Sequence, residues 1–124
     1  MKTLAIAGAA LALVGGSAAK FKVSLTAPTH QPRINVHWPY AVHLMRAGKP
    51  LTGRITVQIV DPIGGVHAVQ FGSTTTDITR FGFRGVFRDY IIWPPESRGI
   101  PLKLRVIVVR TGFRKVISYA VTPR

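Results

Sequence analysis

Four histidines and one methionine come closest, by residue type and spacing, to a metal site in this sequence. His30, His37 and His43 lie within fourteen residues, and Met45 follows two positions after His43. Residues two apart on a β-strand project from the same face, so His43 and Met45 would offer an imidazole nitrogen and a thioether sulfur to one ion. Soft thioether and imidazole ligands suit copper. One hypothesis is therefore an envelope copper carrier.

In that hypothesis the ligands are His43 and Met45, joined by one or more of His37, His30 and His67. The other interpretation is that Met45 packs in a core while His37 and His43 are polar residues at a surface or a sheet edge. A single His-x-Met pair does not repeat at any ligand spacing in the chain. We favour the second interpretation, and we expect no bound metal and no cofactor.

Acidic residues are too few and too scattered to build a catalytic centre. The chain has four, namely Asp61, Asp77, Asp89 and Glu96, and Asp61 already fits a tight turn with Pro62 and two glycines. The sequence contains no nucleophile elbow, no His-Glu-x-x-His motif and no phosphate-binding loop. With no acid, base and nucleophile in a recognisable set, we expect that the protein is not an enzyme and has no catalytic residues.

Basic residues dominate the charge and alternate with aromatic ones near the C-terminus. Lysine and arginine total 17 against 4 acids, which gives a net charge of +13. A field of this sign favours anionic partners. Arginine planes beside aromatic rings can bond phosphates and stack on sugars or bases. The predicted binding surface consists of Arg84, Arg88, Arg105, Arg110, Phe113, Arg114 and Lys115.

The alternative interpretation of this pattern is structural, because half-buried strands also alternate rings with charged groups. Phe113 is the exception, since it lies near the tip of an expected hairpin with little core to enter. We expect the partner to be an anionic cell-wall polymer or another protein. Peripheral contact with a membrane is compatible with the charge, nucleic acid is the less favoured partner, and the sequence leaves the oligomeric state open.

The N-terminus has the pattern of a secretory signal. Lys2 gives a positive start, Leu4–Val14 is apolar, and Ser17-Ala18-Ala19 supplies small residues at a cleavage site. The apolar run is shorter than the roughly 20 residues that a spanning helix needs. We expect a signal peptide over residues 1–19 and an extracytoplasmic domain over residues 20–124, either secreted or held in the cell envelope. The alternative is an uncleaved anchor.

From Lys20 onward, apolar and polar residues alternate in short runs separated by Gly, Pro and Asp, as in an all-β domain. Pro39 predicts an edge position or a bulge for its strand. One of Trp38 and Trp93 is expected in the core. Seven strands in about one hundred residues are typical of an antiparallel β-sandwich, with a small barrel as the competing architecture. The predicted strands are 21–26, 38–45, 54–60, 66–71, 83–93, 102–110 and 115–122.

The segment from Ala47 to Ile59 contains the run Gly48-Lys49-Pro50-Leu51 followed by Gly53 and Val57. It resembles a strand corner of bacterial immunoglobulin-like and fibronectin-type domains. The last two predicted strands resemble the final hairpin of the same sandwich. The resemblance implies a disulfide-free immunoglobulin-like module, as in small secreted bacterial proteins of unassigned activity, that binds, adheres or serves as a scaffold. It implies no functional residues.

Overall fold

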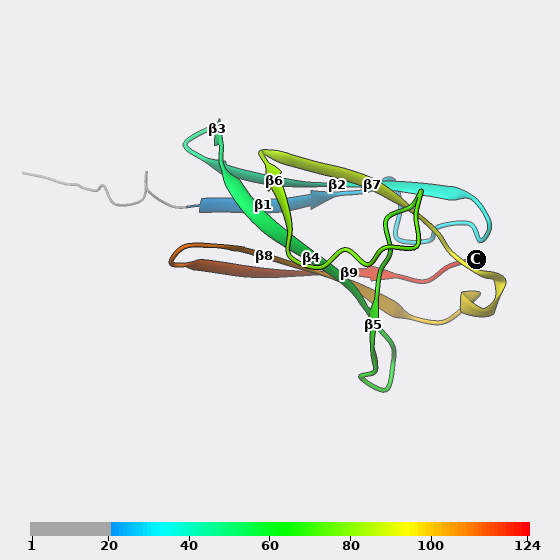
Figure 1. The fold of residues 1–124 in the computed structure, drawn as a ribbon. Helices are drawn as coiled ribbons and strands as arrows, with labels where there is room; N and C mark the ends of the chain where they lie inside the picture. The colour runs from blue at the N-terminus through cyan, green and yellow to red at the C-terminus, as the bar shows by residue number, and fades with distance from the viewer. Residues whose placement is uncertain (1–20) are drawn as a thin grey trace, which may run out of the picture.

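Residues 21–124 are the part of the chain that the computed structural model describes, and they form an all-β fold (Figure 1). The expected signal peptide, residues 1–19, lies outside the described residues. The described part contains a 3-10 helix, η2 (Pro95–Ser97), and nine strands. The strands are β1 (Phe21–Thr26), β2 (His37–Arg46), β3 (Lys49–Pro50), β4 (Thr52–Val60), β5 (Val66–Ala68), β6 (Phe81–Arg84), β7 (Val86–Ile92), β8 (Leu102–Arg110) and β9 (Phe113–Val121).

The strands form two antiparallel sheets that pack against each other (Figure 1). In sheet A, β2 lies in the middle, with β1 on one side and β7 and β3 on the other. In sheet B, β4 has β5 and β6 on one side and β8 on the other, and β9 follows β8. The expected antiparallel β-sandwich is confirmed.

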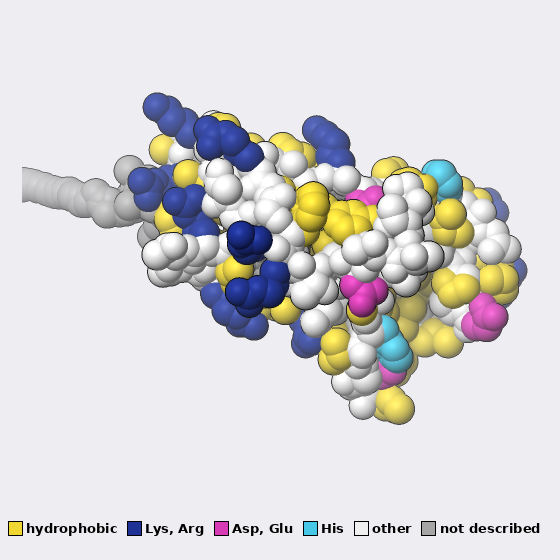
Figure 2. All heavy atoms as spheres, viewed as in Figure 1, with side chains coloured by type: hydrophobic (Ala, Val, Ile, Leu, Met, Phe, Trp, Pro, Cys, Tyr) yellow, Lys and Arg dark blue, Asp and Glu magenta, His cyan; other side chains and the backbone are white. Residues whose placement is uncertain are grey.

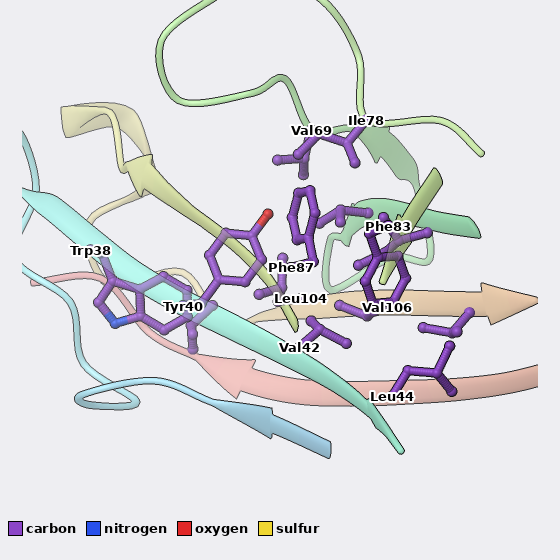
Figure 3. Close-up of a cluster of buried hydrophobic side chains, with 14 of the residues drawn as sticks. Trp38, Tyr40, Val42, Leu44, Val69, Ile78, Phe83, Phe87, Leu104 and Val106 are labelled. Atoms are coloured by element: carbon purple, nitrogen blue, oxygen red, sulfur yellow. The ribbon is translucent and has the colours of Figure 1, made fainter. Parts of the chain in front are cut away.

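The core between the sheets is built from the inward-facing residues of alternate positions (Figure 3). Trp38, Tyr40, Val42 and Leu44 all point inward from β2, as the alternation predicted. The opposing sheet contributes a second apolar layer, Ile55, Val57, Leu104, Val106 and Val108, each of them 0–1% exposed. Trp93 is as buried as Trp38, at 2% exposed, so both tryptophans belong to the core.

Pro39 lies in the central strand of sheet A, at a point where this strand is locally an edge, which agrees with the edge position or bulge that its residue type predicted. The physical reason is the short pairing with β1, which ends at Ala41. At Pro39 only β7 pairs with β2, through Tyr90. A missing backbone donor is therefore tolerated, because the strand is locally an edge.

The chain passes between the two sheets three times, once from β7 through η2 into β8 and twice at neighbouring points at the other end. β3 leads from sheet A into β4 of sheet B through Leu51, and β6 leads back into β7 through Gly85. The N–H of Gly85 donates to the Leu51 carbonyl at 2.9 Å, and the N–H of Leu44 donates to the Gly85 carbonyl at 2.8 Å. The strand predicted over 83–93 is thus two strands in different sheets, and this division, with β3, accounts for nine strands instead of seven.

Tight turns connect the hairpins at the places where glycine and aspartate predicted them. Ala47 and Gly48 both have positive φ, 52° and 75°, as a two-residue type I′ turn requires. The last hairpin also has a two-residue turn, because Arg110 pairs directly with Phe113. Asp61 Oδ1 accepts the N–H of Gly65 at 2.7 Å in the β4–β5 turn. Within residues 21–124, no helix is long and apolar enough to cross a membrane.

Candidate functional site

Five of the seven predicted binding residues meet at one end of the sandwich. Arg110 and Phe113 form the last pair of the β8–β9 hairpin, and Arg114 and Lys115 follow on β9. Arg84 reaches the same end because it pairs with Thr52, the first residue of β4. The strand pairing therefore brings together side chains from three strands of sheet B, namely β6, β8 and β9. The sequence alone did not show that these residues lie at the same end.

Four further cations that the sequence analysis did not single out lie at this same end. Lys22 is the second residue of β1, Arg46 ends β2, and Lys49 begins β3. Arg54 lies across from Val109, whose other partner is Arg114. We call the whole set the basic end. It consists of Lys22, Arg46, Lys49, Arg54, Arg84, Arg110, Arg114 and Lys115.

No acidic residue belongs to the basic end, although the described part of the chain contains all four acids of the sequence. Asp61 directly follows the last residue of β4 and is far along the strand from Arg54, and Glu96 lies in η2 after β7. The strand between Arg54 and Asp61 spans roughly 20 Å. Figure 2 shows the separation: dark blue side chains gather on the half where β1 begins, and magenta side chains lie on the other half.

An aromatic cluster holds the two sheets together beneath these charges. Phe21 of β1 and Phe113 of β9 meet edge to face, with ring centroids 4.6 Å apart at 87°. The guanidinium carbons of Arg46 and Arg110 lie 5.2 Å and 5.5 Å from the centre of the Phe21 ring. Phe113 is half-buried by this packing, which the expectation of an exposed hairpin tip did not include. Cation–π attraction therefore fixes two of the eight cations.

Backbone carbonyls orient two arginines beside an open groove. Arg110 donates to the Thr52 carbonyl at 2.7 Å, and Arg54 donates to the Arg80 carbonyl at 3.1 Å. The groove measures about 490 Å³, and Thr52, Arg54, Val109 and Arg110 are among the residues that line it. This volume is in the range of small-molecule sites. Guanidinium donors at its rim suit phosphate or carboxylate oxygens.

Six cations of the basic end are exposed and make no side-chain hydrogen bond or ion pair within residues 21–124. They are Lys22, Arg46, whose guanidinium lies over the Phe21 ring, Lys49, Arg84, Arg114 and Lys115. Their charges face solvent, so an approaching anion meets them without displacing a protein partner. The basic end thus combines held arginines, which supply geometry, with exposed charges, which supply attraction.

Two predicted binding residues lie elsewhere. Arg88 is on the outer face of sheet A, paired with Ala41. Arg105 is on the outer face of sheet B, where its Nε and Nη2 donate to the Gln58 side-chain oxygen at 3.0 Å and 2.8 Å. Strand alternation placed both correctly on wet faces but could not show that these faces are distant from the hairpin tip.

The candidate metal ligands are spread along the molecule. His43 and Met45 share the outer face of β2, as predicted, but His37 is six residues from His43 on the same strand, roughly 20 Å away. His30 donates through Nδ1 to the Ala120 carbonyl at 2.6 Å. His67 contacts Asp61 at 2.8 Å. No group of three His, Cys, Asp or Glu side chains gathers around one point in the described residues.

Asp89, the carboxylate nearest the core, has a structural partner. Both of its oxygens lie 3.1 Å from the N–H of Gly72, which ties the 69–80 loop to β7. Asp89 also lies across from Tyr40, whose hydroxyl has no hydrogen-bond partner among the described residues. Burial, and secondarily the Asp89 charge, raises the pKa of Tyr40 far above its ordinary value. Tyr40 therefore stays neutral.

The comparisons with known proteins add no family and no relative to this description. No protein-family model, no curated protein and no solved structure matches the chain. The geometry of the basic end therefore makes it the candidate functional site.

Proposed function

We propose that this protein is an exported, non-enzymatic binding module whose basic end holds an anionic polymer of the cell envelope. The observation that carries the proposal is the gathering of eight cations from both sheets at one end of the sandwich, with no acid among them. Such a field concentrates anions near the surface and accelerates their encounter. No bond is made or broken in this mechanism.

Two kinds of basic residue have different roles in this proposal, one in binding the anion at the groove and the other in attracting it. Arg54 and Arg110 are held by backbone carbonyls at the groove and keep guanidinium N–H groups for a phosphate or carboxylate. Lys49, Arg84, Arg114 and Lys115 attract the polymer from a distance. Their exposure makes this attraction sensitive to salt, because charges in water are screened beyond about 8 to 10 Å at physiological ionic strength.

We further propose that the sandwich is of the immunoglobulin-like type and is exported through the signal at residues 1–19. The Ala47–Ile59 corner supports this assignment, because it spans the β2–β3 turn, β3 and all of β4 except Val60, a stretch in which one sheet leads into the other. The two antiparallel sheets are compatible with that fold. A binding or scaffold role, without catalysis, is what this resemblance implies.

The test compares two charge-matched variants of the full chain. The basic-end variant replaces Lys49, Arg84, Arg114 and Lys115 by Gln, and the distal variant replaces Arg33, Arg98, Lys103 and Arg124 by Gln. All eight positions are exposed, and each variant loses four charges. The probe is polyglycerol phosphate, titrated calorimetrically at low and high salt.

We expect the basic-end variant to lose about tenfold or more in affinity at low salt, and the distal variant to lose much less. Binding by the unsubstituted chain should weaken as salt rises. Equal losses in the two variants, or an affinity that salt does not change, would overturn the proposal.

A copper carrier remains the second candidate, and one observation favours it: His43 and Met45 project from the same outer face of β2. Because His37 lies roughly 20 Å from His43 along β2, only two of the three candidate ligands on this strand, His43 and Met45, can reach one ion. Titration with Cu(I) and Cu(II) tests this candidate directly. Stoichiometric uptake that disappears in H43A would support it, and no uptake would remove it.

A further inference from the structure

The described chain begins at the basic end. Phe21, the first residue of β1, pairs with Arg46 and lies under the guanidinium groups of Arg46 and Arg110. Lys20 precedes it in the sequence and brings another positive charge. In Figure 1 β1 begins at one end of the sandwich, and the C-terminus lies at the opposite end.

The sequence before Phe21 sets how far this end can be from a bilayer. The apolar run Leu4–Val14 is followed by the six residues 15–20. Six residues span at most roughly 20 Å even when fully extended. When the apolar run is retained as an uncleaved anchor, its insertion into lipid would hold the basic end within roughly 20 Å of the bilayer, a distance from which the basic end can reach the headgroups.

The charge of the two ends then decides which end faces the membrane. An apolar segment too short to span gives only weak membrane attachment, and a patch of lysine and arginine supplies a second signal toward anionic headgroups. All eight cations of the basic end lie at the end where β1 begins. The opposite end carries Asp61 and Glu96 together with Arg33, Arg98, Lys103 and Arg124, so its acids offset part of its positive charge and anionic headgroups attract it less.

We propose that the basic end docks on the anionic headgroups of a lipid bilayer, with the sandwich standing on this end and the C-terminal end directed away from the lipid. The proposal rests on the proposed function, since it names phospholipid headgroups as the phosphate-bearing partner of the same surface. It adds an orientation that binding to a free polymer does not require.

The first experiment measures how much full-length protein sediments with vesicles. Phosphatidylcholine vesicles alone report attachment through the apolar run, and vesicles that also contain phosphatidylglycerol report the added effect of charge. We expect the unsubstituted chain and the distal variant to bind the anionic vesicles more tightly. The basic-end variant should lose that preference by about tenfold or more, while its binding to neutral vesicles stays unchanged.

The second experiment tests orientation and uses the absence of cysteine from the chain. Single cysteines replace Thr111, in the β8–β9 turn at the basic end, and Ile63, the 94% exposed residue at the tip of the β4–β5 turn. Each is labelled with a fluorophore that brightens in apolar surroundings. On anionic vesicles the T111C label should brighten, and the I63C label should not.

The outcomes separate this inference from the proposed function. Brightening at both labels, or at the I63C label alone, overturns the orientation while charge-driven binding stands. Binding to polyglycerol phosphate with no preference for anionic vesicles overturns the lipid partner but leaves the polymer. Loss of both kinds of binding overturns both proposals.

Discussion

The two ends of the sandwich differ in how the sheets are joined and in which charges they carry. At the basic end two chain crossings, at Leu51 and Gly85, are hydrogen-bonded to each other, and Phe21 packs against Phe113 between the sheets. At the opposite end the chain crosses between the sheets a third time, from β7 through η2 into β8, and a cavity of about 520 Å³ has Val69, Phe71 and Trp93 in its lining.

The cations of the basic end therefore lie where two chain crossings are hydrogen-bonded to each other. Binding surfaces lose affinity when ordering them costs conformational entropy. At the basic end that cost is reduced in advance, since the two crossings and the aromatic cluster already fix the strands that carry the cations. The opposite end has apolar cavity walls and the acids, so a partner there would need different chemistry.

The largest effect is expected from two glycines that have nearly the same backbone angle but lie at opposite ends. Gly85 has φ 73° and Gly99 has φ 76°. A Cβ at Gly85 would lie 2.7 Å from Cβ of Pro50, whereas at Gly99 nothing lies within 4 Å. G85A should lower the free energy of unfolding by about 3 kcal/mol and G99A by about 1 kcal/mol.

Urea denaturation followed by circular dichroism measures both values. If G85A and G99A lowered the free energy of unfolding equally, the backbone at the basic end would be no more constrained than at the opposite end. The proposed structural difference between the two ends would then be wrong.

An intermediate effect is expected from the repulsion among the cations of the basic end. The basic-end variant should unfold at a higher temperature than the unsubstituted chain at low salt, by the equivalent of about 1 kcal/mol, because four like charges are removed. High salt should erase most of this gain by screening. The distal variant, whose charges lie in the half that contains the acids, should gain less. A larger gain in the distal variant would reverse the assignment of charge to the two ends.

The smallest effect is expected at the Asp61–His67 contact in the β4–β5 hairpin. The hydrogen bond from His67, followed by that from the Gly65 N–H, lowers the pKa of Asp61. A lowered pKa in the folded state stabilises the fold above the unfolded pKa, and this contribution disappears as the pH falls through the folded value.

D61N should therefore be slightly less stable than the unsubstituted chain at pH 6, with no difference in strong acid. D77N serves as the control in the same half of the molecule. Denaturation midpoints measured over acidic pH would contradict the assignment if the difference between D61N and the unsubstituted chain stayed constant.

The sequence predicted the inward and outward faces of the strands well, because burial follows a period of two. The inward set of β2 from Trp38 to Leu44 is one example. The crossing at Gly85 could not be predicted in this way. Phe83 and Phe87 are both inward and both buried, yet they belong to different sheets. Alternation distinguishes faces but does not identify the sheet.

The tertiary fold also determines which basic residues lie together at one end, and the sequence pattern predicted only some of them. Arg84, Arg110, Arg114 and Lys115 meet at the basic end, but Lys49 and Arg54 joined them only through the β2–β3 turn and the register of β4 with β8. Ile78 shows the same limit in the core. Its neighbours in the sequence are polar loop residues. It is nevertheless 1% exposed, because its N–H donates to the Val69 carbonyl and its carbonyl accepts the N–H of Val57.

The hydrogen bonds that join Leu44, Leu51 and Gly85 connect the two sheets through the backbone at the basic end. Three backbone hydrogen bonds also join the sheets at the opposite end, because the N–H groups of Ile34, Arg124 and Thr122 donate to the carbonyls of Arg124, Pro32 and His30. Neither end can therefore open without breaking backbone hydrogen bonds. Amide hydrogen exchange would record this closure as slow exchange at Leu51, Gly85 and Ile34 alike.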